Sequence, residues 1–134
     1  MVIYEDKMQF GWEGDGGIGD ELIQQIIDGK KTATCAPKSS YSPAELQETY
    51  DLIGKVCTVI DKQGTPRCNV RHLEVFETTF GNPDPRLVKG EGDEDDTEKF
   101  KNDHVTAWDG MESEGVLLTD ETVLIVEMFE LVEV

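Results

Sequence analysis

The stretch DGKKTATC, residues 28–35, joins the end of a predicted helix to the start of a predicted strand. The residues around and before it, DELIQQIIDG at 20–29, place their apolar side chains along one side of a helix. Gly29 lies where helices commonly end, and Thr34 begins the strand. The two lysines of this stretch therefore lie at a helix end, where the exposed carbonyl groups favour a cation.

Local signals further along the chain predict a second helix and a hairpin. The residues SPAE at 42–45 have the form of a capping box with proline at the first helical position. They predict a short helix through about Tyr50. Residues 55–62 and 67–76 are rich in β-branched and apolar side chains on either side of a turn with glycine and proline, so they predict a β-hairpin.

The last part of the chain combines an irregular stretch with a helix and an apolar strand. Residues 77–96 hold two prolines, three glycines and an acidic run, which predict a long loop. A helix is predicted to start near Asp96, and ETVLIVEMFELVEV at the C-terminal end predicts a strand or two with a buried centre at Val123–Val126. One face of the predicted helix carries Phe100, His104 and Ala107, with Trp108 adjacent.

These elements predict a single α+β domain over residues 1–134, with most strands after residue 55 and therefore antiparallel. No apolar run approaches the ~18–20 residues that span a bilayer. The first ten residues, MVIYEDKMQF, lack the basic start and continuous apolar core of a signal peptide. We therefore expect a cytoplasmic protein without membrane contact.

Charge is distributed unevenly along the chain. The formal net charge is −17, which argues against a general nucleic-acid binder because phosphate binding needs a positive surface. Residues 29–71 nevertheless carry seven Lys or Arg against four acids, so this segment is +3 and the rest is −20. Such a basic segment either attracts a small anionic or electron-rich ligand or is ordinary polar surface. Long polyanions are disfavoured in both cases.

Cysteine usage favours reduced thiols over a disulfide framework or a zinc site. The three cysteines are widely spaced, without a CxxC pair, and only two histidines are present to complete a zinc site. We therefore expect no structural metal and no cofactor. The acidic run Asp93–Asp96 is interpreted as solvated, with weak Mg²⁺ binding as the alternative. The cysteines are Cys35, Cys57 and Cys68.

Several motifs in a fixed order resemble the ASCH-domain family. Residues 29–34, GKKTAT, fit G-x-K-x-x-T, and GEGD follows at residues 90–93. An aromatic residue and His104 come next, and a terminal FELV closes the series. The resemblance covers roughly residues 9–133 and implies a PUA-like fold, a small mixed or antiparallel β-barrel with flanking helices.

The resemblance also implies a function, a cleft that receives a nucleoside or RNA. Some relatives hydrolyse the amide of N4-acetylcytidine with a lysine, a threonine and a glutamate, which here correspond to Lys31, Thr34 and Glu91. The usual family pattern E-G-E-G-D begins with glutamate, and this chain has Lys89 there. The alternatives are therefore a non-catalytic RNA-binding module, or a ribonuclease that acts on single-stranded RNA. The expected partner is a small nucleoside or a short RNA.

Residues near these motifs are candidates for binding the ligand, each with a structural alternative. Tyr41 and Trp12 lie in predicted loops, where they either stack on a base or are ordinary loop aromatics. His104 either serves as an acid or base or packs beside Phe100. Lys30 is an electrostatic neighbour of Lys31. For Cys35, a buried small side chain is favoured over a nucleophile, because no histidine is near it in the sequence.

Overall fold

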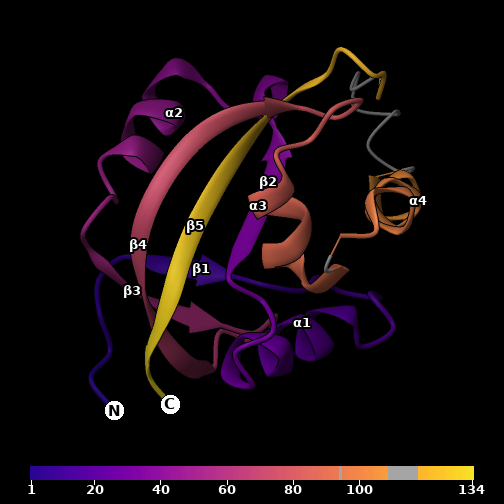
Figure 1. The fold of residues 1–134 in the computed structure, drawn as a ribbon. Coiled ribbons are helices and arrows are strands. Elements are labelled where there is room, and N and C mark those ends of the chain that lie inside the picture. Colours follow the sequence, from indigo (N-terminus) through magenta and orange to yellow (C-terminus); the bar gives the residue numbers. More distant parts are fainter. Residues whose placement is uncertain (94, 109–117) are drawn as a thin grey trace.

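The computed structural model describes residues 1–93, 95–108 and 118–134, with the backbone alone for 106–108. It is an α+β structure, as predicted, with one curved five-stranded sheet and helices around it (Figure 1). The strands are β1 (Lys7–Gln9), β2 (Ala33–Pro37), β3 (Val56–Ile60), β4 (Pro66–Thr79) and β5 (Val123–Glu133). The α-helices are α1 (Ile18–Ile27), α2 (Pro43–Tyr50), α3 (Pro85–Val88) and α4 (Thr97–Trp108), and shorter helical turns span Lys38–Ser40 and Lys89–Asp93.

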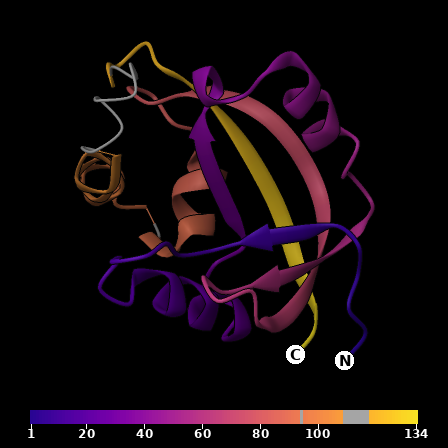
Figure 2. The same cartoon turned by 180° about the vertical axis from the view of Figure 1, so that it is seen from behind.

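The sheet is mixed and has the strand order β1-β3-β4-β5-β2. β1 pairs with β3 in parallel, and the other pairs are antiparallel. The long strands β4 and β5 curve strongly, so that the edge strands β1 and β2 approach each other (Figures 1 and 2). Among the described residues no strand pairing joins these two edges, so the predicted β-barrel is an open one.

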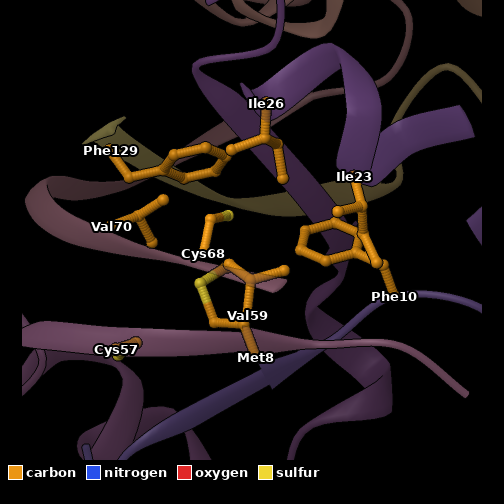
Figure 3. Packing of buried hydrophobic residues seen from close by; sticks show 9 residues of the cluster. All are labelled: Met8, Phe10, Ile23, Ile26, Cys57, Val59, Cys68, Val70 and Phe129. Carbon is orange, nitrogen blue, oxygen red and sulfur yellow. The ribbon is translucent and has the colours of Figure 1, made fainter. Parts of the chain in front are cut away.

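Two hydrophobic clusters lie on opposite faces of the sheet, because side chains alternate along each strand. β5 contributes Phe129 to one face and Leu124 and Val126 to the other. The cluster inside the curved sheet is covered by α1 and contains Met8, Phe10, Ile23, Ile26, Cys57, Val59, Cys68, Val70 and Phe129 (Figure 3). The cluster on the outer face lies under α3 and α4 and contains Ala33, Phe80, Leu87, Val88, Phe100, Leu124 and Val126.

The local signals of the first half are confirmed. α1 is followed by Gly29 in the left-handed region at φ 78°, as expected of a helix-ending glycine. The Ser42 side chain accepts from the Glu45 amide and the Glu45 side chain accepts from the Ser42 amide, which completes the predicted capping box. The predicted hairpin is formed by β3 and β4.

The prediction of a long loop over residues 77–96 is wrong in part. β4 continues to Thr79, and α3 and the turn Lys89–Asp93 are helical. The proline and aspartate that read as loop residues in fact start α3, since Asp84 caps it and Pro85 occupies its first position.

The C-terminal elements follow the prediction closely. α4 begins at Thr97, and Phe100 is fully buried one turn before His104. The side chains of Ala107 and Trp108 lie outside the described residues. The final apolar stretch forms one strand, β5, with a fully buried centre at residues 124–126. None of the described helices is both long and apolar enough to cross a membrane.

Candidate functional site

The lysine of the G-x-K-x-x-T motif and the glutamate of the GEGD motif form a buried ion pair. The Lys31 Nζ lies 3.1 Å from Glu91 Oε1 and donates to the carbonyl oxygen of Ala33 at 2.8 Å. The side chains of Lys31 and Glu91 are 2% and 8% exposed. Because taking two charges out of water is costly unless they are paired, a buried pair of this kind points to a site rather than to surface solvation.

A close backbone approach holds Glu91 at this position. The Thr32 amide donates to the Gly90 carbonyl oxygen at 2.6 Å, so the turn that carries Glu91 is fastened beside the start of β2. A Cβ atom at Gly90 would lie 2.6 Å from the Cβ of Ala33, and only glycine permits this approach without a shift. The GEGD segment therefore positions its glutamate through its first glycine.

His104 and Cys35 complete a group around the same carboxylate. The His104 Nε2 lies 2.8 Å from Glu91 Oε2, and the Cys35 Sγ lies 3.8 Å from both atoms. The His104 Nδ1 lies 2.7 Å from the Phe100 carbonyl oxygen, and the two rings pack 4.2 Å apart. Lys31, Cys35, Glu91 and His104 are called the Glu91 cluster below.

Burial and the neighbouring charges shift the pKa values of Glu91, His104 and Cys35 in the Glu91 cluster. Burial by itself would raise the pKa of Glu91, but the Lys31 ammonium and the His104 ring outweigh it and hold that pKa below its ordinary value. Burial opposes protonation of His104, yet the hydrogen bond and charge of Glu91 raise its pKa. Burial, together with the negative charge of Glu91, raises the pKa of Cys35 well above that of a free thiol. The Cys35 thiol is therefore protonated at neutral pH.

Thr34 lies on the opposite face of β2 from Cys35, because neighbouring residues of a strand point to opposite sides. Its partner across the sheet is Glu127 on β5. Among the described residues no hydrogen bond joins the Thr34 hydroxyl to Lys31 or Glu91. The structure thus brings two of the three predicted catalytic residues into contact and places the third on the inner face of the sheet.

A cleft of about 320 Å³ opens between β1 and β2, where the two sheet edges approach each other. Thr34 and Glu127 line it, and so does Phe10, whose ring centre lies 5.9 Å from the Lys31 Nζ. A second hollow of about 430 Å³ shares Lys7, Thr49 and Leu52 with it. Together the two hollows are lined by two lysines and five carboxylates, namely Asp6, Glu45, Glu48, Asp51 and Glu127.

Glu127 belongs to a second polar group, inside the curved sheet. Its Oε1 lies 2.8 Å from the His72 Nε2, and the opposite nitrogen, Nδ1, lies 3.6 Å from the Cys57 Sγ. The His72 side chain is fully buried. Cys57, His72 and Glu127 are called the His72 cluster below.

The sequence over residues 6–133 matches the family model for the ASCH domain. This chain belongs to the ASCH-domain family. A crystal structure of an ASCH domain from Lactobacillus crispatus JV V101 is similar, with a TM-score of 0.76 and 19% identity over 98% of this chain and 82% of that one. A protein of family DUF984 from Enterococcus faecalis V583 is similar at a TM-score of 0.76 and 20% identity, over 99% and 79% of the two chains. None of the curated proteins matches at a significant level.

The remaining predicted ligand residues lie at different distances from the cleft of this ASCH domain. Tyr41 lines the larger hollow and is partly buried, and burial raises its pKa. Trp12 is 49% exposed in the loop after β1, and Lys30 is exposed at the end of α1. Neither Trp12 nor Lys30 is among the described residues that line the two hollows.

Sequence reasoning missed that Cys35 and His104 lie together in this ASCH domain. The preference for a buried structural cysteine rested on the absence of a histidine nearby in the sequence, and the structure places His104, 69 residues later, 3.8 Å away. His104 packs on Phe100, one of its two predicted roles, and its Nε2 also lies 2.8 Å from Glu91. Its role as an acid or base stays a prediction. Only the docking of α4 onto β2 brings these side chains together.

Proposed function

We propose that this ASCH domain binds an uncharged, nucleoside-sized ligand in the cleft between β1 and β2 and hydrolyses an amide on its base, as in N4-acetylcytidine. The observation that carries the proposal is the buried Lys31–Glu91 pair, whose Nζ lies 5.9 Å from the ring centre of Phe10 in the wall of the small cleft that Thr34 also lines. Lys31 and Thr34 also match, position by position, the lysine and threonine of the family members with this activity. Glu91 takes the part of their glutamate from two residues further along, because Lys89 stands where the family pattern begins with glutamate.

The size and charge of the cleft support a neutral small ligand. A volume of about 320 Å³ is at the lower end of the range for small-molecule pockets. The carboxylates that line the two adjoining hollows outnumber the lysines, and they would repel a phosphate group. A free nucleoside carries no phosphate, so it fits this lining better than a nucleotide or an RNA strand.

The arrangement assigns a role to each side chain. The Thr34 hydroxyl attacks the amide carbonyl and takes the acyl group as an ester, and its proton passes by way of Glu127 to the departing amine. Lys31 is paired with a carboxylate and therefore acts as a cation. Its Nζ lies 5.9 Å from the ring centre of Phe10 in the cleft wall, so its charge acts on the negative oxygen of the tetrahedral intermediate through that wall and not by direct contact. Glu91 holds Lys31 in place. Water then hydrolyses the ester and restores the Thr34 hydroxyl.

Incubation of the protein with N4-acetylcytidine tests this function, with cytidine and acetate measured by chromatography. We expect Thr34→Val to lower kcat/KM by about 100-fold or more, because it removes the attacking hydroxyl. Lys31→Met is expected to lower it by less, because the Lys31 charge acts through the cleft wall. Thr34→Ser retains a hydroxyl and is expected to keep most activity. Lys38→Ala is the matched lysine control, because Lys38 is an exposed residue paired with Glu77 on the surface.

Two results would reject this function. Absence of cytidine release at stoichiometric enzyme, with ligand binding retained, rejects the hydrolysis alone. Absence of any nucleoside binding by calorimetry rejects the cleft as a nucleoside site.

RNA is the alternative partner, and the same preparation distinguishes it. The proposal expects no tight binding of single-stranded RNA, because the cleft lining and the net charge of −17 are both acidic. Tight binding that weakens steeply with salt would replace the proposal with a non-catalytic RNA-binding module. RNA cleavage that EDTA abolishes would replace it with a ribonuclease.

A further inference from the structure

Three side chains of the Glu91 cluster point donor atoms at one small region, and each comes from a different element. Cys35 lies on β2, Glu91 on the turn after α3, and His104 on α4. One sulfur, one oxygen and one nitrogen from these residues all lie within 4.8 Å of one another. We propose that Cys35, Glu91 and His104 form a binding site for a zinc ion. This site goes beyond the proposed hydrolysis and does not depend on it.

The separations between the donor atoms are close to those of a tetrahedral zinc site. Zinc bonds of about 2.3 Å to sulfur and about 2.0–2.2 Å to nitrogen and oxygen put the donors about 3.3–3.6 Å apart. The sulfur lies 3.8 Å from the Glu91 Oε2 and from the His104 Nε2, and the last two atoms are 2.8 Å apart. Only the carboxylate and the imidazole have to separate, by about 0.5 Å, to admit the ion.

Neighbouring groups already orient two of the ligands. The His104 Nδ1 donates its hydrogen to the Phe100 carbonyl, so a neutral ring has its lone pair on Nε2, the atom that faces Glu91 and Cys35. The Lys31 Nζ holds Glu91 Oε1 and leaves Oε2 toward the other two donors. Hydrogen bonds of this kind behind the ligands are characteristic of protein metal sites.

The net charge of the cluster can stay the same when the zinc ion binds. A thiol and a protonated imidazole can each release one proton, and the two protons together carry the charge of one zinc ion. Lys31 then balances one of the two anionic ligands from behind. The mixture of thiolate, imidazole and carboxylate favours zinc over magnesium or calcium, which prefer oxygen donors alone.

The same three residues do not form a nucleophilic triad. In such a triad the histidine uses one ring nitrogen for the nucleophile and the other for the carboxylate. Here the Cys35 sulfur and the Glu91 carboxylate both face Nε2, and the Phe100 carbonyl occupies Nδ1. A metal ion bound by all three residues requires the sulfur and the carboxylate to lie on the same side of the ring, next to Nε2, as they do here. Three protein ligands leave a fourth position for water or another molecule.

Cobalt(II) serves as the spectroscopic probe for this site, and zinc as the competitor. We expect the purified full chain to bind one Co²⁺ with a near-ultraviolet band from thiolate-to-cobalt charge transfer, and zinc to remove the band. Cys35→Ala is expected to abolish the band, and His104→Gln to weaken binding by more than about 100-fold. Cys57→Ala is the matched control, because Cys57 also lies beside a histidine but belongs to the His72 cluster.

The outcome that overturns the proposal is a protein without the charge-transfer band, or a band that survives Cys35→Ala. Loss of the band in Cys57→Ala, with the variant folded by circular dichroism, would also overturn it, since the metal would then lie in the other cluster. Alkylation of the wild-type chain gives a second measurement that needs no variant. Zinc is expected to slow modification of Cys35 as located by mass spectrometry, and an unchanged rate contradicts the site.

Discussion

The Glu91 cluster and the His72 cluster contain the same trio of cysteine, histidine and glutamate in two different arrangements. In the Glu91 cluster, sulfur and carboxylate both face the Nε2 of His104. In the His72 cluster they lie on opposite nitrogens of the ring, with Cys57 beside Nδ1 and Glu127 beside Nε2. Only in the first arrangement can all three side chains bind the same metal ion. The direction in which each donor atom points therefore determines whether a cysteine, a histidine and a glutamate can form a metal site.

The two clusters also differ in whether a lysine is paired with the carboxylate. Lys31 is buried against Glu91, whereas the carboxylate of the His72 cluster reaches the cleft and is 15% exposed. A carboxylate that faces a cleft retains water, and a carboxylate enclosed with a lysine does not. The two clusters therefore differ in what the loss of one charge should cost the fold.

The largest expected effect is that of Lys31→Met. This change leaves Glu91 buried without its lysine, and we expect the free energy of unfolding to fall by about 3–5 kcal/mol in urea denaturation. In the His72 cluster, Glu127→Gln keeps a hydrogen-bond acceptor for His72 and should cost only about 1 kcal/mol. The double variant Lys31→Met/Glu91→Gln should recover part of the loss, since no charge remains unpaired. Equal losses in the two clusters would contradict the difference in burial.

The next effect is that of Gly90→Ala. The added methyl group would meet Ala33, so the turn that carries Glu91 must move away from β2. We expect a loss of about 1–3 kcal/mol, the usual cost of overpacking, together with weaker Co²⁺ binding. Gly64→Ala is a control for glycine replacement, because its Cβ would meet nothing within 4 Å, although its φ of 81° makes the change strained. A Gly90→Ala protein with unchanged cobalt affinity would show that this contact does not position Glu91.

A smaller effect is expected of Cys57→Ala. Cys57 is fully buried among the residues inside the curved sheet, and removal of its sulfur should cost about 1 kcal/mol in thermal or urea unfolding. The cobalt spectrum should not change, in contrast to Cys35→Ala. Cobalt affinity that falls in both variants would mean that the two clusters are coupled.

The smallest effect is a pH dependence of stability that the Glu91 cluster should contribute through His104. The folded pKa of His104 is raised, so its protonation stabilises the fold fully below the ordinary value of 6.5 and is lost as the pH rises through the folded pKa. The folded pKa of Glu91 is lowered, so its contribution is present above 4.5 and is lost as the pH falls through the folded value. Urea denaturation should show a decline on the alkaline side that His104→Gln and Glu91→Gln both reduce. A slope that persists in His104→Gln would assign it to another group.

The sequence predicts the fold correctly where the signal for a helix or strand lies in neighbouring residues. The capping box at residues 42–45, the glycine after α1 and the two strands of the hairpin each depend on neighbours in the sequence. Residues 77–96 were mispredicted because proline and aspartate mark both loops and helix starts, and only the packing of Leu87 and Val88 on the sheet selects the helix.

The site was predictable in part, through the family motifs. The resemblance paired Lys31 with Glu91, and the structure places them 3.1 Å apart. It could not show that Thr34 lies on the other face of β2, because that depends on strand alternation and on the register with β5. The expectation of no metal was based on the spacing of the cysteines and the small number of histidines along the chain. It stays a prediction that the cobalt experiment tests, because ligands from three different elements leave no regular spacing in the sequence.

By itself, the sequence determined the α+β class, most helix and strand positions and the acidic surface, because these follow from periodicity, capping and composition over short distances. Tertiary structure alone decided which face of β2 each side chain occupies and which histidine each cysteine meets. The physical reason is that docking of α4 and the GEGD turn onto β2 joins residues 56 to 69 positions apart. The lysines of DGKKTATC show both kinds of information. Neighbouring residues in the sequence predict that they follow the end of a helix, whereas the burial of Lys31 against Glu91 depends on the tertiary structure.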